Sequence, residues 1–210
     1  MDYIFCSKKK NIFAICFSVL YIVMLILKID FQVSLFQNLR YTINSLFVYL
    51  TPMIVPVFIL TLIFTYKKDY KFKTWLLPIA LGVNLILSVL TQISNIPNMK
   101  LIISLYGLKH LPLLLCSFAM CIAIALMFLG TLFNLRNIKL LKYGALAYAV
   151  LCLCSTIIEF LNVGGIAYIQ SVPAEYSAIN IVALVQLVSC ALFYIGIFII
   201  TTNKRNIDLV

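Results

Sequence analysis

Six long apolar runs, separated by short polar and charged segments, dominate the hydrophobic pattern of this chain. A helix needs about 20 apolar residues to cross the hydrocarbon core of a bilayer. The runs are continuous and lack the polar–apolar alternation that strands of a membrane barrel require. We therefore predict six transmembrane helices, at Asn11–Lys28, Ser45–Tyr66, Thr74–Gln92, Leu111–Leu135, Tyr143–Asn162 and Ala178–Thr201.

The composition supports a membrane protein. Of the 210 residues, 64% are hydrophobic and 10% are charged, whereas a soluble domain has about 25% charged residues. A soluble protein with so few charges would lack the polar groups to cover its surface. Because no Gly-rich, Pro-rich or acidic tract and no internal repeat interrupts the pattern, we expect residues 1–210 to form a single all-α membrane bundle.

The basic residues predict the orientation of the bundle. Of the 16 Lys and Arg residues, twelve fall on one side of the predicted spans. These are Lys8, Lys9, Lys10, Lys67, Lys68, Lys71, Lys73, Arg136, Lys139, Lys142, Lys204 and Arg205. The other four are Lys28, Arg40, Lys100 and Lys109. The positive-inside rule places the richer side, with both termini, in the cytoplasm, as for a multi-pass protein of the plasma membrane.

The net charge of +10 comes from the same Lys and Arg residues. Its charges cluster between apolar runs, without the spread basic face and interleaved exposed aromatics of nucleic-acid-binding proteins. This excludes nucleic acid as a partner and favours contact with anionic membrane lipids.

Two connections on the outer side have apolar patterns of their own. Asp30–Asn44 has apolar residues every four positions, which predicts a helix lying in the membrane interface. Asn98–Lys109 is apolar but too short to span, so it is either interfacial or re-entrant. We expect the two segments to cover the outer side of the bundle.

Polar residues form stripes on two of the predicted helices. In the fifth span they recur at spacings of three and four, which places them on one face: Tyr148, Cys152, Ser155, Glu159 and Asn162. The third span has a similar stripe of Asn84, Ser88, Gln92 and Asn95. Polar groups in hydrocarbon are expensive and often functional. One hypothesis is therefore an outward-facing cavity that binds a ligand through Glu159, Ser155, Asn162, Asn84, Ser88 and Gln92. The alternative is that both stripes form interhelical hydrogen bonds that hold the bundle together.

Glu159 is the only acidic residue within a predicted span. Such a carboxylate is either paired with a cation or kept neutral by burial. Its candidate partners near the outer side are Lys28, Arg40, Lys109 and His110. Both a structural ion pair and a role in ligand binding remain open.

The sequence provides little for catalysis or metal binding. Of the seven cysteines, Cys152 and Cys154 are two apart and should point to different helix faces. His110, the single histidine, is six residues from Cys116 with Pro112 between them, so helical geometry does not pair them. They are weak catalytic candidates. No metal or phosphate-binding motif occurs, so we expect no metal and no cofactor, and a non-enzymatic role is favoured.

One segment nevertheless suggests a family. Residues 109–117 read KHLPLLLCS, which resembles the LPLHLC-type signature of the YwaF-like integral membrane family. The similarity in element order extends from Thr74 to Ile200. It implies a small polytopic bundle related to phospholipid acyl transfer, with Cys116 at the motif cysteine. Leu114 occupies the motif histidine position and the sixth span has no histidine, which implies a degenerate or non-catalytic member.

Three functional hypotheses follow. The first is a module that binds or transports a small molecule or lipid. The second is a membrane-embedded lipid acyltransferase-like protein that uses Cys116. The third is an accessory or assembly subunit, whose stripes pack against a membrane protein partner or a second copy of the chain.

Overall fold

The computed structural model describes residues 8–36, 52–64, 73–106, 111–132, 138–162 and 174–201, and each of these segments is helical. The long helices are α1 (Lys8–Phe36), α3 (Lys73–Tyr106), α4 (Leu111–Leu132), α5 (Ile138–Asn162) and α7 (Ala174–Thr201). All five are long and apolar enough to cross a membrane, and a shorter apolar helix covers Pro52–Phe64. The predicted all-α membrane bundle is confirmed for this part of the chain.

The second predicted span, Ser45–Tyr66, is described only in its central part. The helix Pro52–Phe64 is too short to cross a bilayer by itself. Pro52 is its first residue, a position that favours proline because the first helical N–H groups have no intrahelical acceptor. Residues 45–51 and 65–66 lie outside the described residues, so a sixth complete span stays a prediction.

The two outer segments differ from the prediction where the structure describes them. α1 continues to Phe36 and α3 to Tyr106, so Asp30–Phe36 and Asn98–Tyr106 extend the preceding helices instead of forming separate elements. The 34 residues of α3 have a length of about 51 Å, well beyond a hydrocarbon core of about 30 Å. Extending an existing helix is easier than nucleating a new one, which accounts for the difference. Residues 37–44 and 107–109 lie outside the described part.

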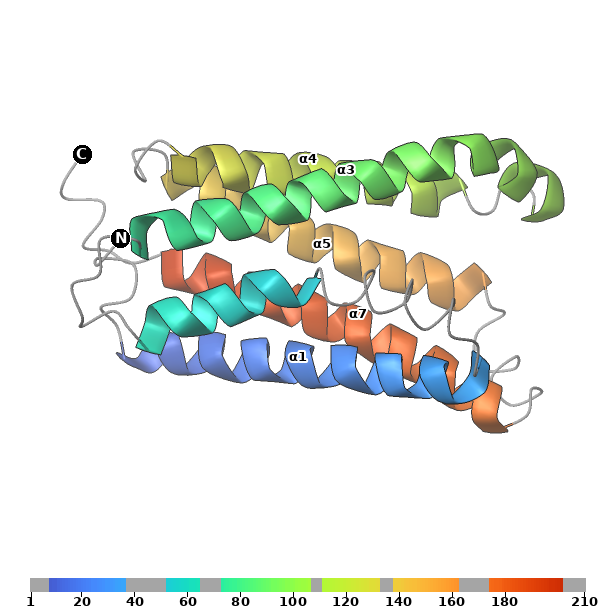
Figure 1. Ribbon diagram of the computed structural model, residues 1–210, viewed down its shortest axis with the longest axis horizontal. Helices are drawn as coiled ribbons and strands as arrows, with labels where there is room; N and C mark the ends of the chain where they lie inside the picture. The colour runs from blue at the N-terminus through green and yellow to red at the C-terminus, as the bar shows by residue number, and fades with distance from the viewer. Residues whose placement is uncertain are drawn as a thin grey trace.

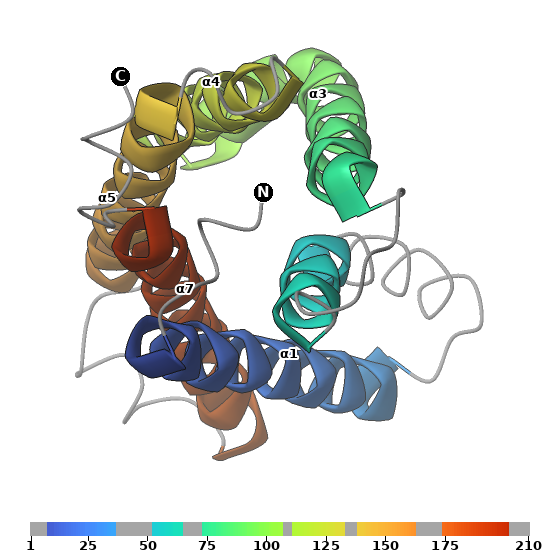
Figure 2. The same cartoon turned by 90° about the vertical axis from the view of Figure 1, so that its left-hand side faces the viewer.

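The helices form a bundle and lie roughly along the long axis of the molecule (Figure 1). α1 begins and α7 ends at the same end, on the left in Figure 1. α3 packs on α4, α4 on α5, α5 on α7 and α7 on α1. Figure 2 shows these helices following one another around the molecule, with the helix Pro52–Phe64 between α1 and α3. Each helix thus has one face toward the interior. The cytoplasmic location of the termini stays a prediction.

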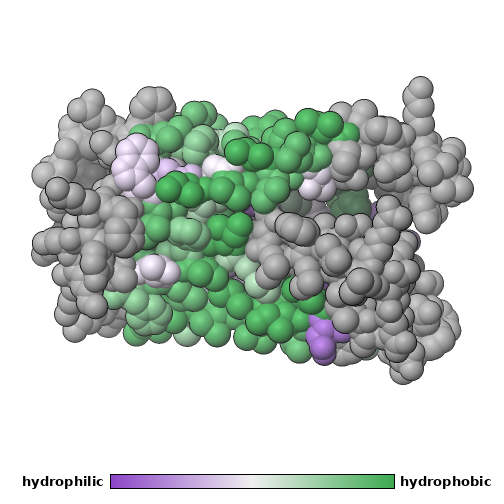
Figure 3. Space-filling model, in the orientation of Figure 1, coloured by the Kyte–Doolittle hydropathy of each residue, from purple (hydrophilic) through white to green (hydrophobic). Residues whose placement is uncertain are grey.

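Large apolar side chains cover the outside of the bundle. Examples, one from each long helix, are Ile12, Ile86, Ile122, Ile157 and Ile181, which are 46–63% exposed. Figure 3 shows a largely apolar band across the middle of the molecule. In water this surface would be strongly unfavourable, whereas the hydrocarbon of a bilayer accommodates it. The chain is therefore membrane-embedded.

The tightest described helix contact lies between α4 and α5, at Gly144. A Cβ atom added there would lie 2.8 Å from Cγ of Met127 and 3.0 Å from the carbonyl oxygen of Ala123. Ala145 and Ala149, also small residues of α5, are buried as well. Membrane helices associate mainly by such close packing, because lipid supplies no hydrophobic drive between them.

We predict that Gly144→Ala destabilises the bundle by about 1–3 kcal/mol, the usual range for overpacking, because the backbone of α4 must shift. Thermal unfolding in detergent measures the change. Gly196→Ala is the control, since its Cβ would come no closer than 3.3 Å to the Phe17 ring and 3.5 Å to Cα of Ala14. Equal melting temperatures for Gly144→Ala and wild type would contradict the close α4–α5 contact.

Candidate functional site

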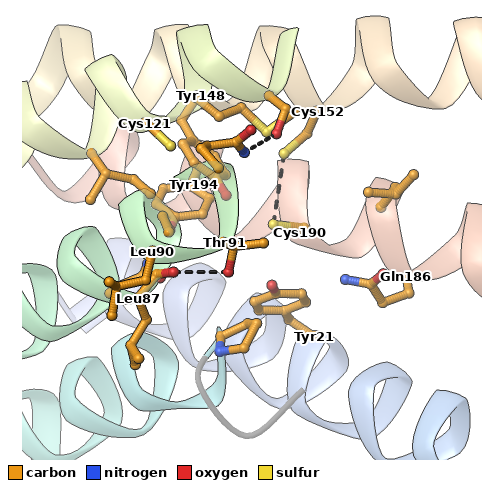
Figure 4. A pocket seen from close by; sticks show the side chains of 18 residues that line it. Tyr21, Leu87, Leu90, Thr91, Cys121, Tyr148, Cys152, Gln186, Cys190 and Tyr194 are labelled. Carbon is orange, nitrogen blue, oxygen red and sulfur yellow. Dashed lines mark hydrogen bonds between the residues drawn. The ribbon is translucent and has the colours of Figure 1, made fainter. Parts of the chain in front are cut away.

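A cavity of about 510 Å³ lies inside the bundle, and all six described helices contribute to its lining. Figure 4 shows the side chains around it. Polar groups come from every long helix: Tyr21; Asn84, Ser88, Thr91 and Gln92; Ser117 and Cys121; Tyr148 and Cys152; Gln186, Cys190 and Tyr194. Apolar side chains such as Leu87, Leu187 and Ile124 complete the wall.

The polar stripe predicted on the third span faces this cavity. Asn84, Ser88 and Gln92 all line it, as expected for residues four apart on one helix face. The adjacent Thr91 also lines it and donates a hydrogen bond to the Leu87 carbonyl of its own helix at 2.9 Å. The side chain of Asn95 lies outside the described part. The role of these residues in ligand binding stays a prediction.

The stripe predicted on the fifth span is divided. Tyr148 and Cys152 line the cavity, whereas Ser155, Glu159 and Asn162 are not part of its lining. Ser155 is 3% exposed and its Oγ has no hydrogen-bond partner among the described residues. Glu159 and Asn162, farther along α5, are half-buried. The stripe is continuous on the helix, but α5 extends beyond the end of the cavity.

Lys28 lies between the Glu159 end of α5 and the cavity wall. Lys28 Nζ donates a hydrogen bond to Gln186 Oε1 at 3.2 Å, and Gln186 lines the cavity. Lys28 also lies close enough to Glu159 for their charges to interact. Such pairing lowers the cost of placing both groups at membrane depth. The other predicted partners of Glu159, Arg40, Lys109 and His110, lie outside the described residues.

Tyrosines form one wall of the cavity. The rings of Tyr148 and Tyr194 are 4.1 Å apart between centroids, and Tyr21 stacks on Phe193 at 5.6 Å. Tyr21 and Tyr194 were not among the predicted site residues. Their position could have identified them. Both lie inside predicted spans, away from the membrane interfaces where tyrosines are enriched. A tyrosine hydroxyl at mid-span needs a polar neighbour.

Two thiols meet in the cavity wall. Sγ of Cys152 lies 3.8 Å from Sγ of Cys190, and both residues are buried. Cys154 is exposed on the opposite face of α5, which confirms that Cys152 and Cys154 point to different faces.

Gln92 carries a polar atom that no described residue satisfies. Its Nε2 donates to Ser117 Oγ, while its Oε1 is buried without a partner. The amide orientation is interchangeable, so one amide atom remains unpaired in either orientation. Leaving such a group unsatisfied costs about 1–3 kcal/mol. A ligand that hydrogen-bonds to Gln92 would remove this cost.

The cavity lining carries no ionisable carboxylate, amine or imidazole among the described residues. The catalytic candidates lie elsewhere: Cys116 is half-buried and outside the lining, as is Leu114 in the motif histidine position, and His110 lies outside the described residues. The described wall thus provides hydrogen-bonding groups, aromatic rings and thiols, but no evident general base.

No family model, curated protein or solved structure matches the chain. The resemblance of Leu111–Cys116 to the YwaF-like signature therefore stays a prediction, and the function must be argued from the cavity itself.

The hydrogen bond between Lys28 and Gln186 at the cavity wall can be tested directly. We predict a coupling energy of about 0.6 kcal/mol, and at most about 1.7 kcal/mol, in a double-mutant cycle of Lys28→Met and Gln186→Leu, as for other interhelical hydrogen bonds in membranes. Reversible unfolding in mixed micelles measures it. Additive effects of the two substitutions would mean that the contact does not form.

Proposed function

We propose that this protein is a membrane-embedded binding module whose central cavity holds a neutral small molecule or lipid-like ligand. The observation that carries the proposal is the cavity of about 510 Å³ lined by hydrogen-bonding side chains from five long helices. This volume is within the 300–1,000 Å³ typical of small-molecule sites. The unpaired amide atom of Gln92 favours a ligand over a purely structural polar interior.

The chemistry of the wall selects the ligand. A charged ligand would have to leave water for a lining without a counter-charge, which costs several kcal/mol. Leucines, an isoleucine and tyrosine rings favour an apolar or aromatic body. Hydroxyl, amide and thiol groups favour one or a few neutral hydrogen-bonding groups on it. The ligand is therefore a neutral amphiphile.

The lining also suggests the route of entry. Leu90 and Thr91 line the cavity and are exposed on the surface, so the opening lies along α3. Thr91 is about 24 Å along the helix from Trp75, given a rise of 1.5 Å per residue. With the termini in the cytoplasm, as the basic residues predict, this opening faces the outer leaflet. A lipid-soluble ligand would enter from the side.

The alternative of lipid acyl transfer requires a nucleophile that reaches the ligand. Cys116, the motif cysteine of the YwaF-like resemblance, is not part of the cavity lining. Accordingly, binding is the better supported function. A role as an accessory subunit would use the apolar exterior instead and would not need the cavity.

We predict that Gln92→Leu abolishes ligand binding and changes the stability of the empty protein by less than about 1 kcal/mol. The substitution removes the unpaired amide atom, which offsets the loss of the hydrogen bond to Ser117, and keeps a side chain of similar size. Native mass spectrometry of gently extracted protein measures the bound molecule, and thermal unfolding measures the stability. Ser18→Ala is the matched control, because Ser18 is also buried with an unpaired hydroxyl but lies outside the cavity lining.

In this experiment, wild type and Ser18→Ala retain a reproducible non-covalent ligand. Equal ligand occupancy in Gln92→Leu would contradict the cavity as the site. Wild-type protein without a ligand, accompanied by a stoichiometric membrane protein, would favour the accessory role.

We predict that Cys116→Ala retains full ligand occupancy, because Cys116 does not face the cavity. Intact mass after hydroxylamine treatment provides the readout for the alternative. A hydroxylamine-labile, acyl-sized adduct on wild type that is missing in Cys116→Ala would instead support lipid acyl transfer.

A further inference from the structure

The closest pair of reactive groups in the described bundle is the pair of thiols between α5 and α7. Sγ of Cys152 and Sγ of Cys190 are 3.8 Å apart, and the two residues are 1% and 4% exposed. A disulfide has an S–S bond of about 2.05 Å. The two thiols lie on helices that are already in contact, and bond formation requires the sulfur atoms to approach each other by about 1.8 Å. Both thiols also line the cavity, so a bound ligand can reach them.

Gln186, one helical turn before Cys190 on α7, accepts a hydrogen bond from Lys28 Nζ at 3.2 Å. Residues four apart on a helix share a face, and both Gln186 and Cys190 line the cavity. We assign the attacking role to Cys190 and the resolving role to Cys152.

The surroundings limit which oxidant can reach these thiols. Glutathione disulfide is charged, and the described lining offers no counter-charge to receive it. The cavity therefore requires a neutral oxidant, and a lipid-soluble two-electron acceptor would enter it from the bilayer. Quinones meet this requirement, and a quinone serves as the final acceptor for protein thiols in the bacterial periplasm.

We propose that Cys152 and Cys190 form a dithiol that exchanges two electrons with a quinone bound in the cavity. This inference rests on the proposed binding function and names its ligand class. The aromatic rings of Tyr148 and Tyr194 match a planar quinone ring. The unpaired Oε1 of Gln92 can accept from a hydroquinone hydroxyl, and after an amide flip Nε2 can donate to a quinone carbonyl.

The chemical step is balanced. Sγ of Cys190 adds to a ring carbon of the quinone, forming an S–C bond, while the thiol proton of Cys190 passes to one quinone oxygen. Sγ of Cys152 then attacks Sγ of Cys190, so the S–S bond forms and the S–C bond breaks. The electron pair returns to the ring, and the second thiol proton goes to the other oxygen. The dithiol is oxidised to a disulfide and the quinone is reduced to hydroquinone.

Because the step is reversible, the ratio of dithiol to disulfide follows the ratio of hydroquinone to quinone in the membrane. The disulfide would join α5 to α7 across the cavity wall. The thiol pair would then report the redox state of the quinone pool to the bundle.

The test uses purified protein in lipid nanodiscs, without oxygen, and a decyl-substituted benzoquinone as the probe. The expected result is one hydroquinone per protein, seen by absorbance, together with a Cys152–Cys190 disulfide in the peptide map of the wild type. Cys152→Ala and Cys190→Ala lose the reaction, and Cys154→Ala on the lipid-facing side of α5 keeps it. Unreacted thiols in wild type, or equal hydroquinone from Cys190→Ala, would overturn the proposal.

A second measurement separates this inference from the binding function. The same quinone is added to the Cys152→Ala/Cys190→Ala double variant, and its thermal stabilisation is measured. Stabilisation of the double variant with no oxidation of wild type would refute the redox step alone. If neither this quinone nor any co-purified neutral molecule binds, both the redox proposal and the binding function fail.

Discussion

The structure depends on the cost of leaving a polar group unsatisfied in hydrocarbon. This cost makes helices the only element that these apolar runs can form, because a helix satisfies its backbone internally. It also turns polar side chains inward, where Asn84, Ser88 and Gln186 meet around one cavity. The same constraint accounts for Lys28, whose ammonium donates to Gln186. Of the buried, unpaired polar groups at Ser18, Ser155 and Gln92, the amide of Gln92 lines the cavity, where a ligand is the natural partner.

The architecture was predictable from the sequence to the extent that it follows from length and hydrophobicity. Five of the six predicted runs coincide with helices long enough to span a membrane, the fourth as far as Leu132. The helix ends were not predictable in the same way: α3 continues to Tyr106 through Pro97, because nothing in an apolar pattern distinguishes a helix that continues past the bilayer from one that stops there. Proline favours a helix end but does not enforce it in membranes.

The candidate site was predictable in part, for a related reason. Helical spacing places Asn84, Ser88 and Gln92 on one face, and that face lines the cavity. The same spacing on α5 includes Glu159, which lies beyond the cavity, because periodicity specifies a direction around the helix and not a depth in the bundle. Tyr21 and Tyr194 were missed because polar stripes were predicted on the third and fifth spans only, although both tyrosines line the cavity.

The central claim is that the cavity holds a neutral molecule in contact with Gln92. The most direct measurement is a crystal structure of the protein grown in a lipid mesophase, with anomalous diffraction from a brominated analogue of the co-purified ligand. The account predicts a bromine position inside the ring of helices and a ligand polar atom within hydrogen-bond distance of the Gln92 amide. A cavity closed by repacked side chains, with bromine found only on the outer surface of the bundle, would contradict it.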